Sequence, residues 1–273
     1  MANEEIAKSI KTGNFNTNYH DLGEGKETIM FIHGSGPGVT AFANWRLCMP
    51  ELSKKFRIIA PDMVGFGYTD RPDGIKYNMD IWVQQAIDLM DSLGIEQTNI
   101  VGNSFGGALA VALVIKYPKR FKKVVLMGAV GVAHDLTYGL DRVWGYTPSL
   151  ENMKEMLDIF AYNRNLVTDE LAKLRYEASI KPGFQEAFSS MFPAPRQNGV
   201  DSMESDEQDI KKIKHDTLII HGREDKVIPL SNSIRFNQLI KKSQLHIFGE
   251  CGHWTQIEHK DRFIKLVDNF ISE

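Results

Sequence analysis

The sequence predicts an α/β protein in which helices flank a mostly parallel sheet and one helical insertion interrupts the pattern. Two observations carry this prediction. Apolar strand-like runs alternate with amphipathic helical segments along most of the chain, and the alternation stops once, for a stretch that is helical throughout. With 273 residues, of which 42% are hydrophobic and 25% charged, the chain has the size and composition of one large domain that carries an insertion.

The expected strands are short runs that end on turn residues. Several are apolar throughout, which is typical of parallel strands buried on both faces. A polar, alternating stretch over residues 15–22 precedes them and could add antiparallel strands at one edge of the sheet. The other runs occupy residues 28–33, 57–62, 98–104, 123–128, 217–221 and 244–248.

One of the intervening helices has clear boundaries in the sequence. Trp82, Ala86 and Met90 share a helical face, as expected for a helix that packs on a sheet. Asn78 is a candidate N-cap, and Gly94 is a candidate C-terminal stop.

The alternation of strands and helices stops between about residues 135 and 200. Amphipathic helical segments near 151–162 and 168–180, punctuated by proline and glycine, take its place. A helical block between two strands of one sheet is typical of a lid over one end of that sheet. We therefore expect a core of residues 1–134 and 201–273 and a helical lid of residues 135–200.

Charge and cysteine content exclude several classes of function. The 32 Lys and Arg against 35 Asp and Glu give a net charge of −3, which argues against nucleic acid or a membrane surface as a partner. No apolar stretch approaches the ~20 residues of a membrane helix, and the opening segment 1–6 is acidic, unlike a signal peptide. Cys48 and Cys251 are too few for a disulfide framework or a four-cysteine zinc site. We expect reduced thiols, no metal, no cofactor and a cytoplasmic location.

A serine stands where a strand passes into a helix. The segment Gly102-Asn103-Ser104-Phe105-Gly106 follows an apolar strand and precedes the helical run 108–117, which is the setting of the nucleophile elbow G-x-S-x-G. Such a turn strains the backbone of the serine, and the flanking glycines let strand and helix approach closely. The alternative interpretation is a glycine-rich packing turn without chemistry.

A nucleophilic serine in this position requires an acid and then a histidine, each after a later strand. Asp225 follows the run 217–221, and His253 follows the run 244–248. His253 would take the serine proton, and Asp225 would orient the imidazole and stabilise its cation. The alternative acid is Glu224, and the alternative bases are His221, His246 and His259.

A glycine-rich loop, His33-Gly34-Ser35-Gly36-Pro37-Gly38, follows the first parallel strand. In this chain order the loop supplies one oxyanion-hole amide, which we assign to Ser35, and Phe105 at the helix N-terminus supplies the other. A phosphate cradle is the rival interpretation, but neither G-x-G-x-x-G nor G-x-x-x-x-G-K is present. We expect His33 to brace the loop by hydrogen bonding rather than to catalyse.

These segments together resemble the meta-cleavage product hydrolases, which are carbon–carbon bond hydrolases of the α/β-hydrolase fold. The resemblance runs from about Tyr19 to the C-terminus. The lid run 150–196 is most similar to the branch that acts on 2-hydroxymuconate semialdehyde. The matching motifs are residues 33–46, 102–107, 222–225 and 251–259.

The resemblance implies a substrate of the 2-hydroxy-6-oxohexa-2,4-dienoate type, formed by ring opening of a catechol. Water would cleave it into 2-hydroxypenta-2,4-dienoate and a small acid, formate in the case of the semialdehyde. The resemblance assigns Arg175 to the substrate carboxylate and Asn44, Asn103 and Trp254 to the 2-oxo end and the chain. Taken singly, Asn44 could instead be a helix cap, Arg175 a solvated side chain and Trp254 part of the core.

The implied mechanism has two stages, ketonisation of the dienol and then attack on the C6 carbonyl. Attack by Ser104 with an acyl-enzyme is preferred, and attack by water activated through Ser104 and His253 is the alternative. The nearest rival function is a carboxylesterase or lactonase with the same triad, and a binding protein without turnover is a second. The family tends to form homo-oligomers, but the oligomeric state and the preferred C6 substituent (hydrogen, methyl or larger) stay open.

Overall fold

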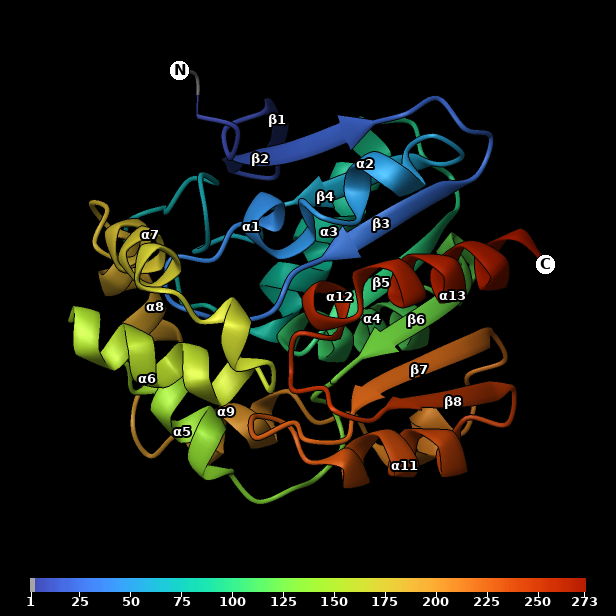
Figure 1. Ribbon diagram of the computed structural model, residues 1–273. Helices are drawn as coiled ribbons and strands as arrows, with labels where there is room; N and C mark the ends of the chain where they lie inside the picture. Colours follow the sequence, from blue (N-terminus) through green and yellow to red (C-terminus); the bar gives the residue numbers. More distant parts are fainter. Residues whose placement is uncertain (1–2) are drawn as a thin grey trace.

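An eight-stranded sheet runs through the part of the chain that this computed structural model describes, residues 3–273 (Figure 1). Residues 1 and 2, which begin the acidic opening segment, lie outside it. The strand order is β1-β2-β4-β3-β5-β6-β7-β8; β2 pairs antiparallel with β1 and β4, and the other pairings are parallel. The predicted α/β class is thus confirmed. The strands are β1 (Lys8–Thr12), β2 (Phe15–Leu22), β3 (Thr28–Ile32), β4 (Arg57–Pro61), β5 (Thr98–Asn103), β6 (Phe121–Met127), β7 (Asp216–Gly222) and β8 (Ser243–Phe248).

Helices cover both faces of the sheet. Helices α3, α4, α10 and α11 pack on one face, and α1, α2, α12 and α13 on the other. Helices α5 to α9 lie beyond the carboxyl ends of the parallel strands (Figure 1). The helices are α1 (Ala41–Trp45), α2 (Met49–Leu52), α3 (Met79–Ser92), α4 (Phe105–Lys116), η1 (Pro118–Arg120), α5 (Tyr138–Trp144), α6 (Leu150–Phe160), η2 (Arg164–Leu166), α7 (Asp169–Ser179), α8 (Phe184–Met191), α9 (Gln197–Ser202), α10 (Glu207–Ile210), α11 (Leu230–Leu239), α12 (Thr255–Glu258) and α13 (Lys260–Ser272).

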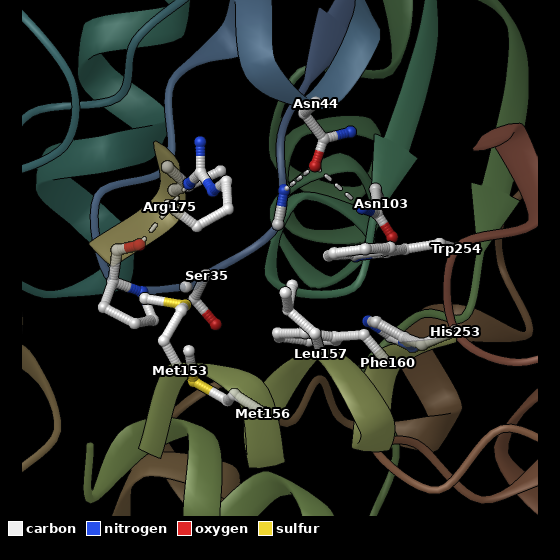
Figure 2. Close-up of a pocket in the computed structure, with 14 residues that line it drawn as sticks. Ser35, Asn44, Asn103, Met153, Met156, Leu157, Phe160, Arg175, His253 and Trp254 are labelled. Carbon is white, nitrogen blue, oxygen red and sulfur yellow. Dashed lines mark hydrogen bonds between the residues drawn. The ribbon is translucent and has the colours of Figure 1, made fainter. Parts of the chain in front are cut away.

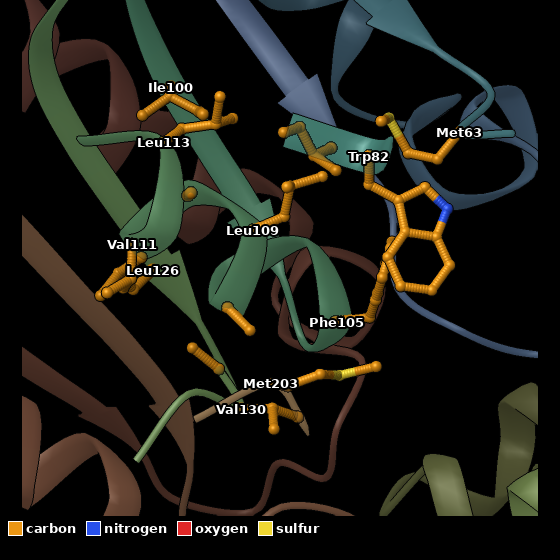
Figure 3. Packing of buried hydrophobic residues seen from close by; sticks show 14 of the residues in the cluster. Met63, Trp82, Ile100, Phe105, Leu109, Val111, Leu113, Leu126, Val130 and Met203 are labelled. Atoms are coloured by element: carbon orange, nitrogen blue, oxygen red, sulfur yellow. The ribbon is translucent and has the colours of Figure 1, made fainter. Parts of the chain in front are cut away.

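The apolar runs of the parallel strands feed two separate cores. Ile29 of β3 belongs to the cluster with α1 and α13, whereas the next residue, Met30, belongs to the cluster with α3 and α4. Successive strand residues point to opposite faces, so a strand covered on both sides must be apolar at every position. Figure 3 shows the second cluster, in which Phe105 packs edge-on against Trp82 with ring centroids 4.7 Å apart. This packing fixes the first turn of α4, next to the serine.

The predicted strands agree with the observed ones to within two residues at each end. The stretch 15–22 forms β2 and supplies the antiparallel edge. Strand β1 was not expected, because Lys8, Ser9 and Lys11 interrupt any apolar pattern in that five-residue segment. Pairing with β2 rather than burial creates this edge strand.

The helix boundaries give one confirmation and one correction. The Asn78 side chain accepts a hydrogen bond from the Ile81 amide at 3.0 Å, which confirms the predicted N-cap. The helical run expected from residue 108 instead begins at Phe105, directly after the serine. Gly106 and Gly107 have low intrinsic helix propensity, but the tight turn at Ser104 forces the chain into the helix from Phe105 onward.

Helices α5 to α9 fall in the segment from 135 to 200, which we call the lid, although α9 continues two residues past its expected end, to Ser202. Among the described residues, no helix is both long and apolar enough to cross a bilayer. The same residues contain no group of three His, Cys, Asp or Glu side chains arranged to hold a metal ion.

Candidate active site

Ser104 occupies a strained turn between β5 and α4. Its φ of 55° and ψ of −113° are rare for a residue with a side chain, and its amide donates to Met127 O at 2.9 Å on the neighbouring strand. The flanking glycines are required sterically: a Cβ on Gly102 would lie 2.2 Å from Gly106 O, and a Cβ on Gly106 would lie 2.4 Å from Ile32 O. The motif therefore forms an elbow that only glycines at these two positions permit.

The structure brings Asp225 and His253 together at the carboxyl ends of β7 and β8. His253 Nδ1 lies 2.7 Å from Asp225 Oδ2, and both side chains are buried. Asp225 Oδ1 accepts the amides of Val227 at 2.7 Å and Ile228 at 3.0 Å. Burial acts to raise the pKa of Asp225, but His253, His221 and the Ile228 amide together outweigh it and hold that pKa below its usual value. The carboxylate is thus ionised, and its bond to Nδ1–H leaves His253 Nε2 as the basic nitrogen.

Gly128 links this pair to the serine. It directly follows Met127, the residue that accepts the Ser104 amide, and a Cβ at Gly128 would lie 3.2 Å from His253 Nδ1 and 3.3 Å from Asp225 Oδ2. The histidine and the acid therefore lie against the glycine that follows Met127, the residue whose carbonyl accepts the Ser104 amide. Within residues 3–273 no hydrogen bond yet joins Ser104 Oγ to His253, a contact that often forms only with substrate bound.

The alternative acid and bases are held by contacts of their own, although one of them, His221, also lies near Asp225. Glu224 Oε2 accepts the Cys251 amide at 3.0 Å, so this side chain braces the loop before the histidine. His221 is fully buried; its Nδ1 lies 2.7 Å from Ser233 Oγ, and its Nε2 lies 3.0 Å from Ile228 O and 3.4 Å from Asp225 Oδ2, so both ring nitrogens are occupied. The other two histidines pack against one ring, Phe248: His246 edge-on and His259 stacked.

The glycine-rich loop after β3 is held from both sides. His33 is fully buried; its Nδ1 donates to Gly34 O at 2.8 Å, and its Nε2 accepts the Met63 amide at 3.0 Å, which confirms the predicted bracing role. From the lid, Trp144 Nε1 donates to Ser35 Oγ at 3.0 Å. Within residues 3–273 the Ser35 and Phe105 amides have no protein acceptor, so both N–H groups are free to bind an anion.

A cavity lies between this loop, the histidine and the lid (Figure 2). Its wall on the lid side is formed by α6, and Arg175 lies across the cavity from His253 and Trp254. Its polar residues include every predicted substrate contact. They are Ser35, Asn44, Asn103, Arg175, His253 and Trp254.

Two amides in this cavity have unsatisfied groups. Asn44 Oδ1 accepts from Asn103 Nδ2 at 3.0 Å and from the Gly34 amide at 3.3 Å. Asn44 Nδ2 and Asn103 Oδ1 are buried without a partner among the described residues. A buried amide group without a partner is costly, so this pair is suited to a ligand that offers an acceptor to Nδ2 and a donor to Oδ1. Asn44 lies within α1, whose N-cap is Thr40, so the helix-cap interpretation of Asn44 is wrong.

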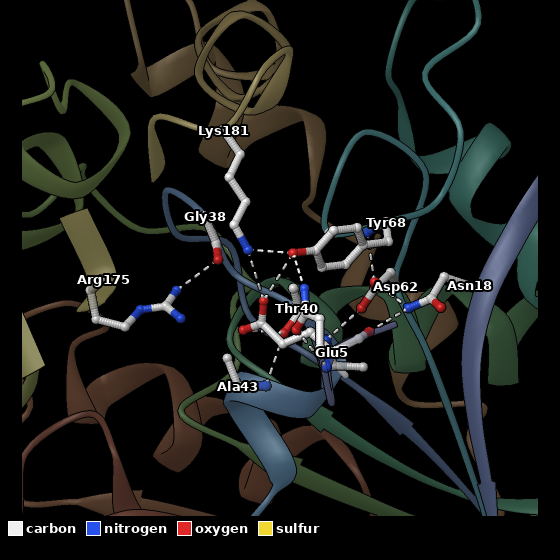
Figure 4. Close-up of polar contacts among 12 residues, drawn as sticks. Glu5, Asn18, Gly38, Thr40, Ala43, Asp62, Tyr68, Arg175 and Lys181 are labelled. Atoms are coloured by element: carbon white, nitrogen blue, oxygen red, sulfur yellow. Dashed lines mark hydrogen bonds and ion pairs between the residues drawn. The ribbon is translucent and has the colours of Figure 1, made fainter. Parts of the chain in front are cut away.

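Arg175 is partly buried and reaches the glycine-rich loop from α7. Its Nη2 donates to Gly38 O at 2.9 Å, and the solvent-exposed interpretation is therefore wrong. Burial lowers the pKa of the Arg175 guanidinium, Glu5 acts to raise it and Arg46 lowers it further. The neighbouring lid cation behaves differently, because Lys181 contacts Glu5 and Tyr68 (Figure 4). Arg175 is thus the lid cation that lines this cavity.

Comparison with known proteins agrees with this geometry. Residues 27–260 match the family model described as the alpha/beta hydrolase fold. The chain is 58% identical over 270 residues to the 2-hydroxy-6-oxo-2,4-heptadienoate hydrolase of Pseudomonas putida F1, covering 99% of this chain and 98% of that protein. It is 57% identical to the 2-hydroxymuconate semialdehyde hydrolase of Pseudomonas sp. CF600, covering 98% and 95%. The chain belongs to the meta-cleavage product hydrolases of the α/β-hydrolase fold.

A solved structure of this family has nearly the same backbone. It is a meta-cleavage product hydrolase from Pseudomonas fluorescens IP01, and it superposes with a TM-score of 0.98 at 61% identity, covering 99% of both chains. These comparisons therefore confirm the fold and the family that we expected from the sequence.

Several cavity residues of this family member were not anticipated from its sequence. The lid wall opposite the polar end is apolar and comes from one face of α6, and Trp144 of α5 reaches the oxyanion loop. The helical periodicity near 151–162 was visible, but which side of that helix meets the cavity depends on how the lid packs. The wall residues are Met153, Met156, Leu157 and Phe160.

Proposed function

We propose that this hydrolase cleaves a carbon–carbon bond of 2-hydroxy-6-oxohexa-2,4-dienoates with a small C6 substituent, 2-hydroxymuconate semialdehyde first among them. The observation that carries the proposal is the position of Arg175, a cation without a carboxylate partner among the described residues, across an otherwise uncharged cavity from His253. A substrate of this kind has an anionic carboxylate at one end and a reacting carbonyl at the other. The proposed site offers one group for each end.

At the carboxylate end, Arg175 would bind the anion. Asn44 Nδ2 would donate to the neighbouring 2-oxygen, and Asn103 Oδ1 would accept the hydrogen bond of the 2-hydroxyl in the dienol form. A guanidinium presents a planar fork of donors that matches a carboxylate. Asn44 Nδ2 is a buried donor that lacks a partner, and it would bind negative charge that develops on the 2-oxygen without adding a net charge to the cavity. Trp254, stacked on Phe160 with ring centroids 5.0 Å apart, would pack against the dienoate chain.

In the chemical steps, the dienol would first ketonise by moving a proton to C5. The resulting 2-oxo group makes the five-carbon fragment a stabilised carbanion leaving group. Ser104, with His253 as base and Asp225 behind it, would then attack C6, while the Ser35 and Phe105 amides stabilise the oxyanion. Water would release the acid from the acyl-enzyme. Attack by water activated through Ser104 and His253 is the alternative second stage.

The wall of the cavity on the lid side is apolar, and we take it as the acyl end. Met153, Met156 and Leu157 contribute flexible, uncharged surface there. Two relatives at 57–58% identity are named for a semialdehyde and for a heptadienoate, which differ by a methyl group at C6. We infer that both hydrogen and methyl are accepted and that larger groups react slowly.

A panel of substrates tests the proposal. The measurement is kcat/KM for dienoates with hydrogen, methyl or phenyl at C6, followed by loss of the yellow dienol absorbance, and for p-nitrophenyl acetate. We expect kcat/KM for the hydrogen and methyl dienoates to exceed kcat/KM for the phenyl dienoate and for p-nitrophenyl acetate. If p-nitrophenyl acetate is the best substrate, the carboxylesterase or lactonase alternative holds instead.

We further propose a cytoplasmic location and a homo-oligomeric state. Both cysteines are free and buried, as is usual for a protein of a reducing compartment. Size-exclusion chromatography with light scattering tests the oligomeric state directly.

A further inference from the structure

A second cavity adjoins the first on its outer side. It lies between α1, the lid segment η2–α7 and the start of α12, and we call it the vestibule. The two cavities share Val39, Asn44, Arg175 and Trp254, so these four residues form the boundary between them. Leu47 lies in the vestibule lining and is 36% exposed, which sets the outer rim at the protein surface.

The vestibule is the larger of the two cavities. Its volume is about 220 Å³, against about 50 Å³ for the inner cavity. Its walls are largely apolar, through Leu166, Leu171 and Ile257. A planar dienoate can therefore occupy it before reaching the triad.

The charged residues of the vestibule are all positive. Arg46 and Arg175 line it, and no Asp or Glu lines either cavity among the described residues. Arg46 is preorganised, because its Nη1 donates to Ala43 O at 2.7 Å. Within residues 3–273 it has no ion-pair partner, so the rest of its guanidinium is available to a ligand.

Arg46 and Arg175 stand one after the other along this path. Arg46 lines only the outer cavity, whereas Arg175 lines both. Glu5, the acid that acts on the pKa of Arg175, is bound to Lys181 and Tyr68 outside both linings (Figure 4). Two unpaired cations, placed one behind the other between apolar walls, raise the local concentration of an anion in this passage.

We propose that the vestibule is the entry path of the anionic dienoate and that Arg46 is a substrate-positioning residue that captures the carboxylate before Arg175 receives it. The proposal rests on the proposed function, because it assumes an anionic substrate. Arg46 takes no part in the chemical steps. Its contribution is to the rate of association, which depends on ionic strength.

The test compares the Arg46→Gln variant with wild type at ionic strengths from about 0.02 M to about 0.5 M, a range over which the screening length falls severalfold. At low salt, kcat/KM for 2-hydroxymuconate semialdehyde should fall about threefold to tenfold in the variant, a typical effect of losing one steering charge. The variant and wild type should converge at high salt. The single-turnover rate at saturating substrate should not change, and Arg46→Lys should restore most of kcat/KM.

Two controls separate this effect from others. Lys214→Gln removes a positive charge just before β7, at the opposite end of the parallel strands, and should leave the salt dependence intact. The neutral p-nitrophenyl acetate should be hydrolysed equally by wild type and Arg46→Gln. An unchanged salt dependence in Arg46→Gln, or a slower single-turnover rate, would overturn the role of Arg46. If wild type turned over no dienoate at all, the proposed function itself would fail.

Discussion

The indole Nε1 of Trp144 donates to Ser35 Oγ at 3.0 Å, so helix α5 of the lid is bonded to the loop that carries an oxyanion-hole amide. Trp144 is itself fixed, since Phe192 stacks on it with ring centroids 4.4 Å apart and an interplanar angle of 4°. The lid therefore not only covers the cavity but also positions the loop that carries the Ser35 amide.

Trp144→Phe removes this hydrogen bond and keeps the stacked ring. We expect kcat to fall about threefold to tenfold with little change in KM, because the Ser35 amide is reoriented rather than lost. Ser35→Ala, which keeps the amide, should give a similar loss. Steady-state kinetics of both variants and the double variant check this, since effects that simply add would show that the two side chains act independently.

Asp225→Asn should lower kcat by about 10³–10⁴-fold, because a neutral amide neither fixes the tautomer of His253 nor stabilises its cation. Glu224→Gln is the matched control, since Glu224 bonds the Cys251 amide and not the histidine. It should retain activity within a few-fold. If kcat falls more in Glu224→Gln than in Asp225→Asn, Glu224 rather than Asp225 is the catalytic acid.

Arg175→Ala should raise KM for the dienoate by about 10–100-fold, the value of a charge-assisted hydrogen bond, and affect kcat less. Hydrolysis of neutral p-nitrophenyl acetate should be nearly unaffected. Lys181→Gln removes the neighbouring lid cation, which contacts Glu5 and Tyr68, and should leave KM within about twofold. Unchanged kinetics in Arg175→Ala would exclude this residue from the site.

The buried imidazole of His33 makes the free energy of unfolding depend on pH. Burial lowers the pKa of His33 to about 4, although its bond to Gly34 O acts in the opposite direction, and protonation would break the bond from the Met63 amide to Nε2. The unfolded chain, with a histidine pKa near 6.5, binds the proton more readily. The free energy of unfolding should therefore fall by roughly 3 kcal/mol as pH falls from about 6.5 to about 4.

Urea unfolding of wild type and His33→Asn across that pH range measures this contribution. The variant should be less stable at pH 7 but lose less stability on acidification. Other buried histidines, such as His221, contribute in the same direction in both proteins, so the difference between the two slopes is informative. If the free energy of unfolding changes with pH by the same amount in wild type and His33→Asn, His33 does not titrate as described.

Residues whose role is set locally could be predicted from the sequence. The elbow at Ser104 follows from two glycines at fixed spacing between a strand and a helix, and the acid and base follow from the chain order of the later strands. Adjacent residues are harder to separate: Asp225 and Glu224 both follow β7, and only the path of the loop shows which carboxylate reaches His253. Strand β1 lacks a local signal because its partner, β2, defines it.

Residues that act through the packing of distant segments could not be predicted. Trp144 is 109 residues from Ser35 in the chain, and no periodicity links them. Arg46 appears in the sequence as one more residue of the glycine-loop motif, and its place in the vestibule depends on where η2 and α7 of the lid lie. The lid thus determines most of what the sequence leaves open.

The central claim is that Ser104 and its partners hydrolyse a carbon–carbon bond of an anionic dienoate. The most direct test is product analysis after 2-hydroxymuconate semialdehyde is incubated with wild type and with Ser104→Ala. Wild type should give equal amounts of 2-hydroxypenta-2,4-dienoate and formate, and Ser104→Ala should bind the dienoate but form these products several orders of magnitude more slowly. An unchanged dienoate with wild type, or near-normal product formation by Ser104→Ala, would contradict the account.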